Sequence, residues 1–173
     1  MHTASAVESY LAQTATDTLC LTFRLSDQDY GIAISKVQEI REWTKVTPLP
    51  SSPAYVRGML NLRGAIVPVI DLRLRFGLEA LEHDSATVII VVNVGNRLAG
   101  ILVDAVSDVV SVDHDQRRAL PEFEGHANRR FIDGLAQLDD RLMVLLNVDQ
   151  LVTSDDLATG PKTAGETDQR GGA

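Results

Sequence analysis

The feature that most constrains the fold of this chain is an internal repeat, because its two halves align in their apolar residues and glycines. Gly31 aligns with Gly100 at an offset of 69 residues (100 − 31), and the apolar residues on either side match in the same frame. Beyond a polar insertion the offset becomes 76 residues (134 − 58), which aligns Gly58 with Gly134. Apolar alternation alone can align by chance between β-rich segments, but matched glycines and acidic residues in one frame favour a duplication.

Each half of the repeat has the pattern of two β-hairpins separated by a long loop. In the first half, apolar and polar side chains alternate over residues 19–25, as in a strand with one buried face, and residues 30–34 return as its partner. Residues 35–43 fit either a helical turn or a strand, and we favour a short turn followed by a strand. A proline-rich loop over residues 48–53 is predicted to end in one helical turn, residues 53–57.

The second hairpin of the first half places an arginine at a tight turn. Gly64 supplies the positive φ that a short hairpin turn needs, so Arg63 stands at the tip of a stiff ribbon. Pro68 has no N–H to donate, which predicts an edge strand or a bulge at that position. The matched turn of the second half is Asp139-Asp140, so the hairpin itself does not require arginine. We therefore interpret Arg63 as a functional residue rather than an ordinary solvated turn residue.

These patterns predict an all-β fold of two small five-stranded β-barrels related by duplication, with short helical turns and a C-terminal helix that begins near Val148. The first module is expected at residues 19–84 and the second at residues 85–153, and an exchange of strands between them is left open. Residues 1–18 are expected to be flexible, and residues 154–173, which are small and polar, are expected to form a disordered tail.

The composition argues against several classes of function. A net charge of −8 over 173 residues, with no stripe of lysine and arginine, does not suit the binding of a phosphate backbone. The single cysteine, Cys20, cannot form an internal disulfide, which fits a reducing cytoplasm. The densest apolar segment, residues 88–92, is far shorter than the roughly 20 residues of a membrane-spanning helix. We therefore expect a cytoplasmic protein with no direct membrane insertion and no nucleic-acid partner.

No catalytic constellation is visible in the sequence. The four histidines lie in polar segments without metal-ligand spacing, and no phosphate-binding or nucleophile motif occurs. We therefore expect neither an enzyme nor a metal or cofactor site. Glu39, Arg41 and Trp43 place charges and an aromatic ring at a candidate surface, because tryptophan and arginine are frequent at interfaces, although a core position for Trp43 stays open. The chain is interpreted as a module that binds other molecules.

Four motifs of the sequence resemble those of the CheW-type coupling proteins of bacterial chemotaxis, and the similarity extends from about Leu19 to Val152. The motifs lie at residues 30–32, 37–41, 58–73 and 100–109. The resemblance implies two SH3-like β-barrels, no enzymatic activity and a scaffold that couples chemoreceptors to a histidine kinase. The implied partners are the cytoplasmic tips of methyl-accepting chemoreceptors and the regulatory domain of the CheA-type histidine kinase.

The resemblance also implies two sets of contact residues. Those that would face the receptor, in a groove between the barrels, are Val37, Gly100, Val106 and Val109, with Arg63 where receptor state is communicated. Those that would lie nearer the kinase are Glu39, Ile40, Pro50, Ala54 and Gly58. The implied protein is a monomer in isolation and is recruited from the cytoplasm to membrane-associated receptor arrays. The alternative is a regulatory barrel that senses a small molecule, which would need a concave pocket with convergent polar groups.

Overall fold

The computed structural model describes residues 18–80, 82, 84–121 and 129–152. The flexible N-terminus predicted for residues 1–18 therefore falls, apart from Thr18, outside the described residues, as does the disordered tail predicted for residues 154–173. Within the described ranges, no helix has the length and apolar character needed to cross a membrane.

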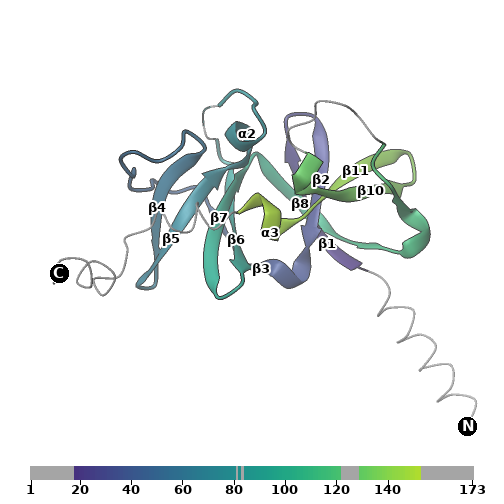
Figure 1. The fold of residues 1–173 in the computed structure, drawn as a ribbon, viewed down its shortest axis with the longest axis horizontal. Coiled ribbons are helices and arrows are strands. Elements are labelled where there is room, and N and C mark those ends of the chain that lie inside the picture. The colour runs from purple at the N-terminus through teal and green to yellow at the C-terminus, as the bar shows by residue number, and fades with distance from the viewer. Residues whose placement is uncertain (1–17, 81, 83, 122–128, 153–173) are drawn as a thin grey trace, which may run out of the picture.

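Strands dominate the structure, and the helices are single turns (Figure 1). The strands are β1 (Thr18–Leu25), β2 (Gln28–Ala33), β3 (Val37–Glu42), β4 (Val56–Leu62), β5 (Ala65–Asp71), β6 (Val88–Val94), β7 (Arg97–Val103), β8 (Ala105–Val112), β9 (Arg117–Arg118), β10 (Ile132–Leu138) and β11 (Arg141–Leu146). The helical turns are η1 (Ile34–Lys36), α2 (Leu72–Arg75), η2 (His114–Gln116), η3 (Arg129–Phe131) and α3 (Val148–Leu151). The order of η1 and β3 confirms the turn and strand favoured for residues 35–43, and α3 confirms the C-terminal helix.

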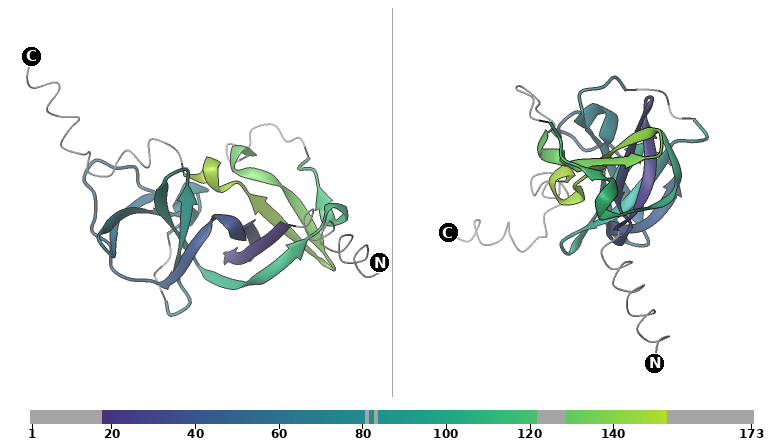
Figure 2. Two further views of the ribbon diagram at one scale, coloured as in Figure 1. Left: turned by 90° about the horizontal axis from the view of Figure 1, so that it is seen from below. Right: turned by 90° about the vertical axis from the view of Figure 1, so that its right-hand side faces the viewer.

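The strands form two sheets that curl into two SH3-like barrels lying side by side (Figures 1 and 2). Barrel A is the six-stranded sheet with the order β8-β1-β2-β11-β10-β9, and barrel B is the five-stranded sheet with the order β3-β6-β7-β5-β4. Each barrel combines strands from both halves of the sequence, and the chain crosses between the barrels after β2 and after β7. The boundary predicted between the two modules, at residues 84 and 85, falls between β5 and β6, which both belong to barrel B. The division of the sequence into these two modules stays a prediction.

The strand pairing confirms the duplication, because matched strands pair in matched registers. In the β1–β2 hairpin Leu21 pairs with Ile32, and in the β6–β7 hairpin Ile90 pairs with Ile101, which is the same pairing displaced by the first offset of the repeat. The β4–β5 and β10–β11 hairpins each carry a register shift next to the matched glycine of the repeat. The strand orders agree as well. When each strand of barrel B is replaced by its counterpart in the other half of the repeat, the order becomes β8-β1-β2-β11-β10, which is the order of barrel A without β9.

Each barrel is closed where the chain continues from an edge strand to the hairpin on the opposite side. In barrel B the segment after β3 brings Thr47 into a bridge with Met59 of β4. In barrel A the segment after β8 forms the two-residue strand β9, in which Arg118 pairs with Leu135 of β10. β9 is the sixth strand of barrel A, and two residues are too few to produce a recognisable hydrophobic alternation.

Two local predictions are wrong. Residues 53–57 contain no helical turn: a turn closed by the hydrogen bond from the Val56 N–H to the Pro53 carbonyl, at 3.0 Å, leads directly into β4. Pro68 lies on a strand between β4 and β7 rather than at an edge, and the register shift of this hairpin lies near Gly58 instead. The missing N–H of proline is tolerated because the parallel pairing of β5 with β7 begins only at the next residue, Val69.

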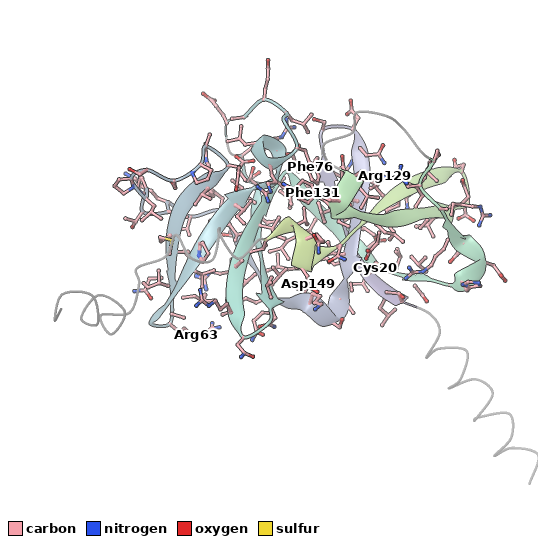
Figure 3. The ribbon with its side chains drawn as sticks, in the orientation of Figure 1. Cys20, Arg63, Phe76, Arg129, Phe131 and Asp149 are labelled. Atoms are coloured by element: carbon pink, nitrogen blue, oxygen red, sulfur yellow. The ribbon has the colours of Figure 1, made fainter. Side chains whose placement is uncertain are left out.

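The largest hydrophobic core lies between the two barrels, and residues of both sheets contribute to it. Four aromatic rings form a row through this core, with 5.8 Å between successive centroids: Phe23, Tyr30, Phe76 and Phe131. Figure 3 labels the last two of them. Phe76 lies directly after α2, which follows β5 of barrel B, whereas the other three rings belong to barrel A, so the rings pack the barrels against one another. Each barrel also encloses a smaller apolar cluster, and Trp43 packs half-buried against that of barrel B.

Candidate interaction surface

The β4–β5 hairpin presents Arg63 to solvent at its tip (Figure 3). Arg63 and Gly64 have φ values of 51° and 92°, and positive φ at both central residues is typical of the two-residue turns that fit the twist of a hairpin. The Gly64 N–H donates a hydrogen bond of 2.9 Å to Oδ1 of Asn61, which fixes the turn further. The Arg63 side chain remains 68% exposed, so its guanidinium stands on a rigid support and is accessible to a partner.

The guanidinium of Arg63 contacts the carboxylate of Glu39 on β3, with 2.8 Å between the terminal nitrogen and Oε2. Because β3 and β4 are the outermost strands of the barrel B sheet, this ion pair links the two edges at one end of the barrel. Arg41 donates a second hydrogen bond, of 3.3 Å, to the other carboxylate oxygen of Glu39. The hydrogen bond from Arg63, followed by that from Arg41, holds the pKa of Glu39 below its ordinary value despite partial desolvation.

The matched positions of barrel A do not reproduce this ion pair. Asp108 and Asp139 stand where barrel B has Glu39 and Arg63, and two acidic side chains cannot attract one another. Asp108 instead accepts a hydrogen bond of 2.7 Å from the hydroxyl of Thr22 on the neighbouring strand. The fold is thus compatible with either arrangement, so among the described residues barrel B has an ion pair at these two matched positions and barrel A has none.

Apolar side chains face solvent at matched positions of the two barrels. Ile40 on β3 is 45% exposed, and Val109, its counterpart on β8, is 51% exposed. Ile66 on β5 and its counterpart Leu142 on β11 are exposed as well. An apolar side chain that faces water from a strand gains free energy when a partner covers it, so each barrel offers a corresponding contact position.

The residues assigned to the receptor by resemblance occupy different environments. Val109 and Arg63 are exposed and can touch a partner directly. Val37 and Val106 are half-buried and pack against the core between the barrels. Gly100 is buried, and a Cβ on it would lie 2.8 Å from a methyl carbon of Ile89, so its backbone has no room for a side chain. The receptor role of these five residues stays a prediction.

The residues assigned to the kinase divide in the same way. Ile40, Pro50 and Ala54 are exposed, and Glu39 is held by Arg63 as described. Gly58 is buried with φ at 149°, and a Cβ on it would lie 2.2 Å from the carbonyl oxygen of Thr47. Gly58 is therefore required for the close approach of two backbone segments that carry the neighbouring loop. The kinase role of this set also stays a prediction.

Sequence reasoning missed several features of this surface. The alignment of the halves matched Ile66 with Leu142, but apolar residues on strands are usually buried, so the pattern gave no sign of their exposure. The ion pair between Arg63 and Glu39 was missed because the two residues are distant in sequence and lie on strands that do not pair. Within the described residues, no group of three or more histidine, cysteine, aspartate or glutamate side chains is arranged to hold a metal ion.

Comparison with known proteins gives a consistent result. A family model described as CheW-like domain matches residues 19–156. A chemotaxis protein CheW from Klebsiella aerogenes is 43% identical over 138 residues, which cover 80% of this chain and 83% of the relative. A chemotaxis protein CheW from Rhizobium meliloti is 39% identical over 136 residues, covering 79% and 88%. The crystal structure of the scaffolding protein TtCheW from Thermoanaerobacter tengcongensis superposes with a TM-score of 0.73 at 30% identity, covering 80% of this chain and 94% of that one.

Proposed function

Because this chain belongs to the CheW-like family, we propose that it holds a CheA-type histidine kinase and methyl-accepting chemoreceptors together without any enzymatic activity of its own. Its relatives are chemotaxis proteins and a scaffolding protein of the same fold, and the chain is a coupling adaptor in chemotaxis. The part of the kinase that binds this chain is the regulatory domain, and the part of the receptor that binds it is the cytoplasmic tip. The protein is a cytoplasmic monomer that is recruited to receptor arrays at the membrane.

The observation that carries this proposal is the rigid, exposed Arg63 hairpin beside β3. Arg63 and Glu39 offer complementary charges at one end of barrel B, and Ile40 adds an exposed apolar side chain on the same strand as Glu39. Adjacent side chains of a strand point to opposite faces, so barrel B presents a charged contact on one face of β3 and an apolar contact position on the other, and protein–protein interfaces use both kinds of contact. The matched strand β8 of barrel A provides the second contact position with Val109.

We assign the kinase to the exposed Ile40, Pro50 and Ala54 of barrel B, and the receptor to Val109 of barrel A and Arg63 of barrel B. Glu39 belongs to the kinase set and contacts Arg63 of the receptor set, so the two contact regions adjoin at the end of barrel B. The half-buried Val37 and Val106 and the buried Gly58 and Gly100 act through the backbone shape of these strands and not by direct contact. A receptor hairpin presents helices, and helices bind by laying apolar side chains into a groove. When one scaffold holds both partners, each raises the effective concentration of the other.

Matched lysine substitutions separate the two sides. Ile40→Lys is expected to lower the affinity for the kinase regulatory domain at least tenfold, about 1.4 kcal/mol, because it places a charge in an apolar contact. Its affinity for a receptor fragment should stay within about twofold of wild type. Val109→Lys is expected to show the reverse pattern, and titration calorimetry with each purified partner measures both. Equal losses for both partners from either variant would contradict the assignment of sides.

The function itself is tested with the unmodified chain. Immobilised protein is expected to retain the kinase regulatory domain and a receptor signalling fragment when each is offered alone. Retention of neither partner would refute the adaptor proposal for these partners and would favour the alternative of a barrel that senses a small molecule. An unrelated folded domain with a similar net negative charge serves as the control, because it reveals any retention that arises from charge alone.

A further inference from the structure

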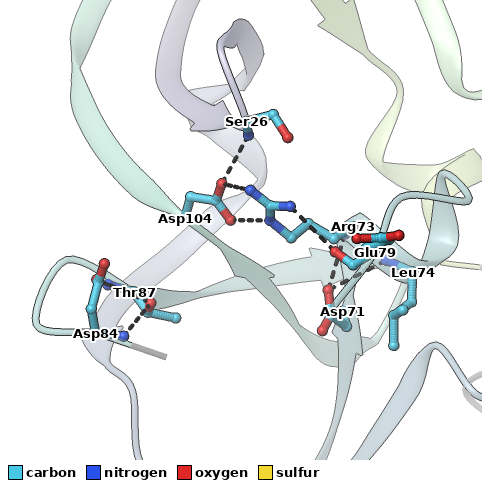
Figure 4. Close-up of polar contacts among 8 residues, drawn as sticks. All are labelled: Ser26, Asp71, Arg73, Leu74, Glu79, Asp84, Thr87 and Asp104. Carbon is cyan, nitrogen blue, oxygen red and sulfur yellow. Dashed lines mark hydrogen bonds and ion pairs between the residues drawn. The ribbon is translucent and has the colours of Figure 1, made fainter. Parts of the chain in front are cut away.

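A partly buried ion pair joins the two barrels (Figure 4). Arg73, on the turn α2 that follows β5 of barrel B, contacts Asp104, which lies between β7 and β8 where the chain crosses to barrel A. Nε of Arg73 lies 2.6 Å from Oδ1 of Asp104, and the terminal nitrogen lies 2.5 Å from Oδ2. The two side chains are 11% and 29% exposed. This is a bidentate contact between a planar guanidinium and a carboxylate, which fixes orientation as well as distance.

Each member of the pair is anchored to a different barrel. On the side of barrel B, the Asp71 carboxylate at the end of β5 accepts the backbone N–H of Arg73 at 3.0 Å and so holds α2 in place. On the side of barrel A, Oδ2 of Asp104 accepts the N–H of Ser26 at 2.8 Å, and the N–H of Asp104 donates to the carbonyl of Arg24 at 3.1 Å. The contact between Arg73 and Asp104 is therefore the link in a continuous polar connection from one barrel to the other.

The other crossover, after β2, carries a weaker counterpart with reversed charges. Lys36 on η1, where the chain first crosses between the barrels, lies 3.2 Å from Asp149 on α3. Asp149 matches Arg73 in the repeat, so in both halves the turn after the second hairpin holds a crossover segment by an ion pair. The side chains of Lys36 and Asp149 are 39% and 50% exposed, and such exposed pairs contribute little. This pair is thus a matched control for the contact between Arg73 and Asp104.

The carboxylate of Asp104 is charged at neutral pH. Burial alone would raise its pKa, but the hydrogen bonds from Arg73 and the Ser26 N–H, with the charge of Arg73, outweigh burial and place the pKa below the ordinary value of 3.8. A carboxyl whose pKa is lowered in the folded state contributes stability above its unfolded pKa and loses it as pH falls through the folded pKa. The ion pair is therefore complete throughout the neutral range.

We propose that Arg73 and Asp104 form a latch that fixes the orientation of barrel A relative to barrel B, and so positions β8 relative to the Arg63 hairpin. Asp104 directly precedes β8, which carries Val109, and Arg73 follows β5, whose opposite end carries Arg63. The apolar core between the barrels is non-directional, whereas the bidentate contact selects one angle. The assignment of these strands to partners rests on the proposed function, but the latch itself does not.

The latch is tested by the distance between two nitroxide labels in the full chain, with Cys20→Ala as background. Cysteines for labelling replace Asn96, at the β6–β7 turn of barrel B, and Asp140, at the β10–β11 turn of barrel A. Wild type and Lys36→Met are expected to give one narrow distance distribution. Arg73→Met and Asp104→Asn are expected to give a distribution roughly twice as wide. Arg73→Lys is expected to give an intermediate width, because lysine keeps the positive charge but cannot make the bidentate contact. Distributions as narrow as wild type in both Asp104→Asn and Arg73→Lys would overturn the proposal.

A second readout tests the consequence for signalling. Kinase activation by receptors is expected to fall about fivefold or more with Asp104→Asn and to stay near wild type with Lys36→Met. A widened distribution with undiminished activation would overturn the positioning role of the latch. If the unmodified chain activates no kinase at all, the proposed function has failed, and the label distances still decide whether the latch exists. If Arg73→Met does not fold, the conservative variants Asp104→Asn and Arg73→Lys give the result.

Discussion

Arg63→Glu is expected to reduce receptor-stimulated kinase activation roughly tenfold or more, while the free energy of unfolding changes by less than about 1 kcal/mol. The side chain is 68% exposed, so its loss removes no core contact, and exposed ion pairs add little stability. The substitution places two carboxylates at the end of barrel B where a cation is available to a partner in the wild type. A coupled assay of kinase autophosphorylation with receptor-containing membranes measures activation, and urea denaturation measures stability.

Two further variants define how Arg63 acts. Asp139→Arg, at the matched turn of barrel A, is the control and is expected to leave activation unchanged. The charge-swapped double variant Glu39→Arg with Arg63→Glu is expected not to restore activation, because it rebuilds the internal ion pair but removes the exposed cation from the hairpin tip. Full restoration by the swap would assign the role to the ion pair itself. Activation at the wild-type level with Arg63→Glu alone would refute any role of this hairpin.

Gly58→Ala is expected to destabilise the fold by roughly 3 kcal/mol, the sum of backbone strain and steric overlap. The added Cβ would lie 2.2 Å from the Thr47 carbonyl oxygen, at a φ of 149° that residues with side chains rarely adopt. The added Cβ and the Thr47 carbonyl oxygen cannot move apart freely, because two backbone hydrogen bonds, of 2.9 and 2.7 Å, join Thr47 to Met59, the residue after Gly58. Chemical denaturation monitored by the fluorescence of Trp43 measures the loss.

The duplication supplies a matched control for this substitution. Gly134 has nearly the same φ, 157°, but a Cβ on it would lie 3.2 Å from the nearest atom, the carbonyl oxygen of Arg118. Gly134→Ala is therefore expected to cost only about 1–2 kcal/mol, most of it from the backbone conformation. Equal losses at the two glycines would show that the approach of Thr47 is not responsible.

The repeat allowed most of the architecture to be predicted from sequence. Matched glycines and alternating apolar residues predicted paired hairpins, and the registers of Leu21 with Ile32 and of Ile90 with Ile101 confirm the offset of the repeat. The pattern could not tell which hairpin joins which barrel, because each hairpin has the same apolar alternation whichever sheet it enters. The crossovers after β2 and β7, which decide this, are only a few residues long and carry little hydrophobic signal.

The candidate site could be predicted only in part. The difference between Arg63 and Asp139 at matched turns singled out Arg63, and the structure places it at an exposed tip. Its partner Glu39 was assigned to another role, because a contact between edge strands depends on how the sheet curls and not on local sequence. The helical turn over residues 53–57 was wrong for a similar reason: Val56 already pairs with Ile70 in the sheet, and tertiary pairing overrides a proline that favours a helix start.

Simultaneous binding tests the central claim most directly. The kinase regulatory domain is captured on the immobilised protein, and the receptor signalling fragment is then added at a saturating concentration. Two separate contact sides predict that the kinase domain stays bound while the receptor fragment adds its own mass to the complex. Displacement of the kinase domain by the receptor fragment would show that the two partners compete for one site and would contradict the account of an adaptor that couples them.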